Sequence, residues 1–232
     1  MYKSLGIQQQ NAIYEAVLKG LEQHGDQMNL AILKKFLEED GSNYAKTALS
    51  QIRPLIDRNP FDSEKTIDWK NVIESDGKVY IIQLTGFPRD VQLIIAEFIL
   101  WDLWNYSIRN GNKNKPIPVV LDEAQNLDHT EKSPSARILQ EGRKFGWSAW
   151  YSTQFLKAQL TPDELARVQM ASQKVYFSPP EQEIPNIVSG FSKDASERRF
   201  WERKLALLKK GQCVVHGPIR GDDGQLTQPT KV

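Results

Sequence analysis

Hydrophobic residues recur every three or four positions through the first sixty residues, which is the spacing of one face of an amphipathic helix. Pro54 falls inside this pattern and is expected to kink or shorten a helix there. Asn59 and Pro60 then interrupt it. We therefore predict a helical section over residues 1–60. Its expected helices cover 7–23, 29–39 and 43–56.

From residue 77 onward, short apolar runs alternate with longer helical patterns. This alternation is typical of an α/β fold with a mostly parallel sheet and helices on both faces. We predict this domain over 61–217, and a flexible tail over 218–232, which is rich in Gly, Asp, Gln and Thr. The expected strands cover 78–84, 117–121, 147–153, 174–177 and 212–217. One expected helix ends near 108, and another begins at 161. The other expected helices cover 134–145, 179–188 and 195–208.

Composition narrows the class of protein. The most apolar segment, 90–104, is interrupted by Glu97 and Asp102, so its uncharged run is far shorter than the ~20 residues that a membrane span needs. We expect a core helix and no membrane partner. The single cysteine, Cys213, excludes an internal disulfide framework, fits a cytoplasmic location and is expected to be buried. The start of the chain lacks the apolar core of a signal peptide.

The apolar run that begins at Pro116 ends abruptly in two acids, Asp122 and Glu123. The next expected strand of the sheet ends at Thr153 and Gln154. Because ligands bind beyond the carboxyl ends of parallel strands, these side chains are expected to meet at one edge. An acidic turn without function is the alternative interpretation of the acid pair.

Together these residues fit the needs of a magnesium–triphosphate site. Magnesium needs only one or two carboxylates, and Asp122 is the candidate metal ligand. Glu123 is the candidate general base for the attacking water, and Gln154 could hold that water or sense the terminal phosphate. A cation from a neighbouring subunit could stabilise the developing charge, with Arg143 as first candidate and Lys144 as second. Taken singly, each residue also has an ordinary surface interpretation.

Four stretches carry a family resemblance: LGIQQQNAIYEAVLKGLEQHG, VVLDEAQNL, EGRKFGWSAWYSTQ and KKGQCVVHGP. They resemble the carboxyl-terminal half of HerA/FtsK-type P-loop ATPases, which are ring-forming motors that act on DNA. The resemblance is weaker for one branch, the DptH-like ATPases of phosphorothioation-dependent DNA restriction systems.

The resemblance implies a RecA-like core, ATP and Mg²⁺ as cofactors, and a ring, expected to be a hexamer. It also implies double-stranded DNA and restriction-system proteins as partners. It makes Asp122 and Glu123 the Walker B pair and Gln154 the sensor. Arg143 becomes a finger that reaches a neighbouring subunit, and Lys144 is the second candidate for contact with the nucleotide.

The chain lacks the phosphate-binding loop of this family. A Walker A motif needs Gly-x-x-x-x-Gly-Lys followed by Ser or Thr, whereas Gly77 and Lys78 are followed by Val79. In the family this loop precedes the helical segment, so we expect it upstream of Met1 and expect the chain alone to bind ATP poorly. The alternative is a non-catalytic interaction module with a P-loop-like fold.

The segment 196–210 is rich in Arg and Lys. The favoured interpretation is a solvated helix face on which Glu197 and Glu202 supply partner charges; contact with DNA is the alternative, for this segment and for the loop 110–115. His129 and His216 are expected to be incidental, because scattered histidines do not make a metal site.

Overall fold

The computed structural model describes residues 5–61, 65–75, 77–156, 159–227 and 230–231. Contacts divide the chain into two compact units, 1–99 and 100–232. This boundary falls inside helix α5 (Arg89–Asn110). The amino-terminal part of α5 belongs to the first unit because its apolar residues pack there. Leu55 of the helical section joins a buried cluster with Val91, Ile94 and Ile95.

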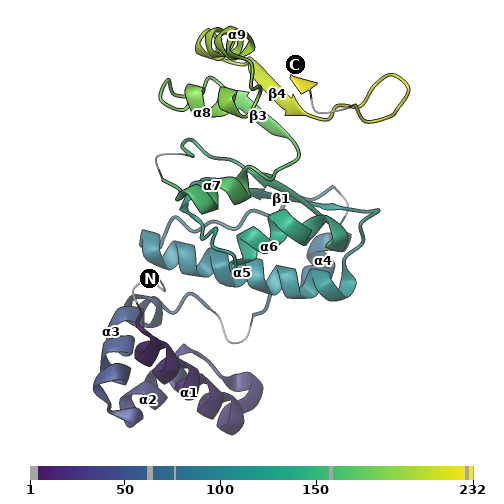
Figure 1. The fold of residues 1–232 in the computed structure, drawn as a ribbon. Coiled ribbons are helices and arrows are strands. Elements are labelled where there is room, and N and C mark those ends of the chain that lie inside the picture. Colours follow the sequence, from purple (N-terminus) through teal and green to yellow (C-terminus); the bar gives the residue numbers. More distant parts are fainter. Residues whose placement is uncertain (1–4, 62–64, 76, 157–158, 228–229, 232) are drawn as a thin grey trace. The chain divides into compact units, whose positions relative to one another are not determined.

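The first unit is built on three helices, coloured purple to blue in Figure 1: α1 (Ile7–His24), α2 (Leu30–Asp40) and α3 (Asn43–Arg58). The three helices predicted for the opening section are confirmed. The Asn29 side chain caps α2 by accepting from the amides of Ala31 and Ile32, both at 3.0 Å. Pro54 does not end α3, which continues to Arg58.

The run 78–84, predicted to be a strand, belongs to no strand of the structure. Val79 and Ile81 are 86% and 85% exposed. A β-branched run favours a strand only where a neighbouring strand and a packed face support it, and none pairs with it among the described residues. An unpredicted short helix, α4 (Trp69–Glu74), precedes the run and is capped by Asp68.

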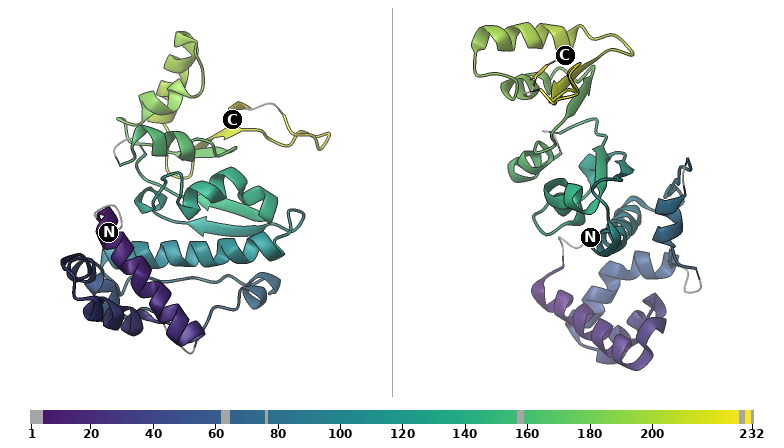
Figure 2. Two further views of the ribbon diagram at one scale, coloured as in Figure 1. Left: turned by 60° about the horizontal axis from the view of Figure 1, so that its bottom comes forward. Right: turned by 90° about the vertical axis from the view of Figure 1, so that its right-hand side faces the viewer.

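The second unit contains the parallel pair that the sequence predicted. Strands β1 (Ile117–Leu121) and β2 (Trp147–Tyr151) run parallel, with Ile117 opposite Trp147 and Leu121 opposite Tyr151. Between them in the sequence come α6 (Pro134–Glu141) and a 3-10 turn, η4 (Gly142–Phe145), in the teal part of the ribbon in Figure 2. Ser133 caps α6 as expected. The α-helix ends at Glu141, four residues before the predicted end, because η4 tightens its last turn.

A second sheet corrects the prediction of a mostly parallel arrangement. Its strands β3 (Lys174–Phe177), β4 (Cys213–Gly217) and β5 (Thr230–Lys231) are antiparallel, in the order β3-β4-β5. Helix α7 (Pro162–Val168) precedes this sheet, and two helices, α8 (Ile184–Ser189) and α9 (Ala195–Ala206), separate β3 from β4. Each helix can reverse the chain once, so two successive helices return it antiparallel where a single crossover helix would make it parallel.

The closing segment is more regular than the predicted flexible tail. The amide of Thr227 donates to the carbonyl of Ile219 at 2.8 Å, which closes a hairpin. Lys231 then pairs with His216 in the sheet and forms an ion pair with Glu197 of α9. Cys213 is exposed rather than buried, because side chains alternate between faces along β4 and its neighbour Val214 takes the inner position.

We expect His216 to make the stability of the second sheet depend on pH. Burial lowers the pKa of its ring, and the charges of Lys174 and Lys231 lower it further. The stability contributed by the neutral ring is therefore fully present above the unfolded value of about 6.5 and is lost as pH falls through the lower folded value. We expect His216→Gln to flatten the decline of the urea midpoint between pH 7.5 and 5. Equal curves for His216→Gln and the parent would contradict this.

Candidate acid–amide site

The acid pair lies at the carboxyl end of β1, in a turn that β2 holds in place. The amide of Ala124 donates to the carbonyl of Ser152 at 2.8 Å, and the amide of Ser152 donates to that of Leu121 at 2.9 Å. Glu123 has a φ of 51°, in the left-handed region that non-glycine residues seldom adopt. A 3-10 turn, η3 (Ala124–Asn126), follows it. The chain thus turns away from the line of β1 directly after the second acid.

Glu123 receives one amide donor on each carboxylate oxygen. Gln154 Nε2, beyond the end of β2, donates to Glu123 Oε1 at 2.6 Å, and Gln125 Nε2 donates to Oε2 at 2.5 Å. The predicted meeting of Glu123 and Gln154 is therefore confirmed. The contribution of Gln125 was missed, although an amide two residues after the acid was visible in the sequence.

The edge is open to solvent. Asp122, Glu123 and Gln154 are all exposed. Each carboxylate oxygen offers two acceptor positions, so either oxygen of Glu123 can accept its amide and still accept a water. Asp122 Oδ1 accepts from the Glu123 amide at 3.0 Å, which leaves Oδ2 for another partner. In this geometry the Asp122 carboxylate can bind a hard cation, and the Glu123 carboxylate can accept a hydrogen bond from a water.

Arg143 and Lys144 lie away from these residues. Both belong to η4, which leads into the amino end of β2, whereas the acid pair follows the carboxyl end of β1. A strand of this length separates the two ends by about 16 Å. Both side chains are exposed, and Lys144 Nζ lies 3.6 Å from Glu141 Oε2. Neither Arg143 nor Lys144 lies near the acid pair of its own chain. Their positions are therefore compatible only with the predicted role toward a neighbouring subunit.

His129, expected to be incidental, is a buried part of the turn that carries the acids. It is 1% exposed. Its Nε2 lies 2.7 Å from the carbonyl oxygen of Ala124, and its Nδ1 lies 2.8 Å from Ser135 Oγ of α6. The Tyr151 hydroxyl at the end of β2 donates to the Ser135 carbonyl at 3.0 Å. The ring therefore ties the residue after Glu123 to α6, and the Tyr151 hydroxyl ties α6 to β2.

We expect His129→Ala to reduce the stability of the second unit by about 2–3 kcal/mol, because it leaves a cavity and removes one hydrogen-bond partner from each of two buried polar groups. Amide hydrogen exchange at 121–124 would measure this locally. Ser135→Ala, which removes one of the two ring contacts, is expected to lose about 1 kcal/mol. Unchanged exchange in both variants would show that the ring does not support the turn.

The donor set limits what the site can hold. No group of three or more His, Cys, Asp or Glu residues suited to a metal ion occurs in the described part of the chain. A transition-metal site of the usual protein kind, with three or four side-chain ligands, is thus not found there. Magnesium, which keeps most of its waters, remains compatible with Asp122. Gln125 Oε1 is buried and lacks a hydrogen-bond partner, so this turn also holds an unused acceptor.

Across the described ranges, no helix combines the length and the apolar character that crossing a membrane requires. Comparison with known proteins assigns the chain to no family. No protein-family model matches it, and no curated protein is significantly similar to it.

Proposed function

We propose that this chain carries the hydrolytic half of a magnesium-dependent ATPase of the HerA/FtsK type, with a RecA-like core, that moves along double-stranded DNA. The observation that carries the proposal is the 2.6 Å hydrogen bond between Gln154 and Glu123 at the tips of two adjacent parallel strands. An acidic turn without function would not require a hydrogen bond from an amide side chain at the end of the neighbouring strand. The sequence stretches that resemble such motors supply the choice of ATP and DNA.

The proposed roles follow from the positions of the side chains. Asp122 holds the hydrated magnesium ion, which when bound neutralises charge on the terminal phosphates. Glu123 accepts a proton from the attacking water through an oxygen position that the amides leave free. Gln154 orients that carboxylate and, by moving its amide from Glu123 to a phosphate oxygen, reports whether the terminal phosphate is present.

Two parts of the site must come from outside these residues. The 232 residues contain no glycine-rich phosphate loop, so another stretch of polypeptide supplies it. The cation must also come from elsewhere, since Arg143 and Lys144 lie at the far ends of the strands. A head-to-tail ring would bring Arg143 of one copy to the acid pair of the next, and such interfaces close into rings. A hexamer and an association with restriction-system proteins are the extensions of this proposal.

Manganese, as a paramagnetic substitute for magnesium, tests the metal site in the chain alone. We expect Mn²⁺ to broaden the amide resonances of 121–124 and 152–154 in a ¹⁵N spectrum, and excess Mg²⁺ to reverse the effect. Asp122→Asn should abolish the broadening, whereas Asp26→Asn, which removes an exposed carboxylate in the first unit, should not. Broadening that survives Asp122→Asn, or that centres on 143–144, would overturn the assignment of Asp122.

The second candidate function is a non-catalytic interaction module with the same fold. The missing phosphate loop favours it. Under that hypothesis the acid pair has no chemical task, and the chain isolated with its natural partners shows no ATP hydrolysis that depends on Glu123.

A further inference from the structure

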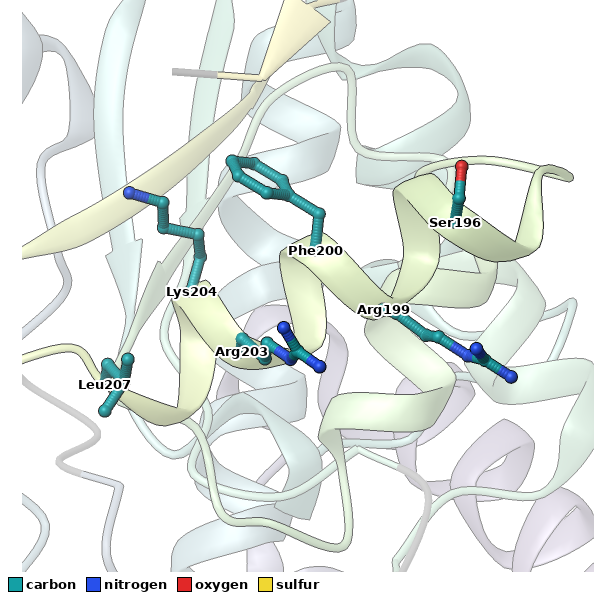
Figure 3. Close-up of a pocket in the computed structure, with 6 residues that line it drawn as sticks. All are labelled: Ser196, Arg199, Phe200, Arg203, Lys204 and Leu207. Carbon is teal, nitrogen blue, oxygen red and sulfur yellow. The ribbon is translucent and has the colours of Figure 1, made fainter.

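One face of α9 presents cations and apolar side chains without any acid. Six residues at helical spacing line a shallow furrow along this face, and we call them the basic row. Figure 3 shows them following one another along the helix. They are Ser196, Arg199, Phe200, Arg203, Lys204 and Leu207.

The helix itself accounts for only part of the basic row. Cations in a last turn are favoured by the helix dipole, which explains Arg203 and Lys204. It does not explain why Phe200 and Leu207 are 51% and 75% exposed beside them. Exposed apolar side chains between cations are typical of a binding surface, whereas a helix face that only contacts solvent does not require them.

The acids of α9 do not neutralise this row. The sequence pattern favours a solvated face on which Glu197 and Glu202 pair with the cations. In the structure Glu197 instead forms an ion pair with Lys231 of β5, and neither acid lines the furrow. Among the described residues, no salt bridge is found to Arg199, Arg203 or Lys204. Their charges are thus available to an outside anion.

The aromatic ring indicates which kind of polyanion fits. Lys204 Nζ lies 5.6 Å from the centre of the Phe200 ring, so a cation and a half-exposed ring lie together at one place on the helix. Single-stranded nucleic acid is bound by this combination, in which cations follow the phosphates and aromatic rings stack on unpaired bases. The row from Ser196 to Leu207 is about 16 Å long, enough for several successive nucleotides. An acidic peptide would use the cations but not the ring.

We propose that the basic row of α9 binds single-stranded nucleic acid, with Arg199, Arg203 and Lys204 on phosphates and Phe200 stacked on a base. The proposal rests on the proposed function only for the choice of DNA over RNA. It adds to that function a contact with an unpaired strand, which a motor on double-stranded DNA does not by itself require.

Fluorescence anisotropy with a labelled twenty-nucleotide oligothymidylate tests the row, without nucleotide and over a range of salt. The triple variant Arg199→Gln/Arg203→Gln/Lys204→Gln should flatten the plot of log affinity against log salt by about 2, since each single-strand contact contributes about 0.7. Phe200→Ala should weaken binding by roughly 5- to 100-fold through lost stacking. The matched control Lys19→Gln/Lys35→Gln/Lys46→Gln removes three exposed cations from the first unit and should leave the slope unchanged.

Each other outcome counts against the proposal. A basic-row variant indistinguishable from the control overturns it. If the triple variant loses binding to a labelled DNA duplex and Phe200→Ala has no effect on binding, the single-strand assignment is overturned. A polyglutamate peptide that binds as tightly, with the same dependence on the row, identifies an acidic protein as partner instead. Glu123→Gln should not alter DNA binding here, so failure of this inference is distinguishable from failure of the proposed ATPase.

Discussion

Replacing Glu123 with glutamine should reduce ATP hydrolysis by about 10²- to 10⁴-fold, the usual contribution of a positioned general base. Glutamine keeps the size of the side chain and can still accept a hydrogen bond from one neighbouring amide, but it cannot accept the proton of the attacking water. Nucleotide affinity should change little, because binding depends on the phosphate loop and the metal rather than on this carboxylate. The loss should therefore fall on kcat.

The measurement needs the site in its complete form. A tagged chain isolated from its native cells keeps its natural partners, and steady-state release of phosphate with Mg²⁺ and ATP gives kcat and KM. Glu131→Gln is the matched control, since it alters an exposed acid eight positions farther along the chain. A Glu123→Gln complex that turns over at the parent rate, or a parent complex without ATPase activity, would contradict the proposed function.

Replacing Gly146 with alanine should destabilise the parallel pair by about 3 kcal/mol. Its φ is 79°, and a Cβ there would lie 2.7 Å from the carbonyl oxygen of Asn112. This is a backbone atom, which cannot move away without a shift of the chain. Its own carbonyl accepts from the Ile117 amide at 2.8 Å and so joins the starts of the two strands. Backbone strain and overpacking therefore act together at the point that aligns β1 with β2.

Amide hydrogen exchange along β1 and β2 reports this loss locally, which suits a chain with two compact units. A loss of 3 kcal/mol corresponds to roughly 100-fold faster exchange. Gly211→Ala separates the two causes, because its φ is 86° but a Cβ there would meet nothing within 4 Å. Followed by exchange along β4, which Gly211 precedes, it should show only the strain of the left-handed conformation, about 1–2 kcal/mol. Equal losses in the two variants would mean that contact with Asn112 is unimportant.

The site was predictable to the extent that it depends on the ends of strands. The abrupt change from an apolar run to Asp122 and Glu123 marked the end of β1, and the rule for parallel strands brought Gln154 to the same edge. His129 and Gln125 were not predictable in this way. Their contacts depend on a left-handed turn at Glu123 and on the packing of α6, and neither leaves a periodic signal in the sequence.

The fold was predictable where local signals decide it. Capping residues such as Ser133, and the Thr161–Glu164 capping box, fixed the starts of α6 and α7. Long-range pairing was not predictable. The run 78–84 has the composition of a strand but lacks a partner in the described structure, and the direction of β4 depends on two intervening helices rather than on its own residues.

A double-mutant cycle between Glu123 and Gln154 on ATP turnover tests the central claim most directly, namely that the two side chains act as one unit on one water. Gln154→Ala should lower kcat about tenfold in the parent complex through lost orientation of the base. In the Glu123→Gln complex the same change should have almost no effect, because the base that it orients is gone. Equal, multiplicative losses in both backgrounds would show two independent residues and would contradict the account.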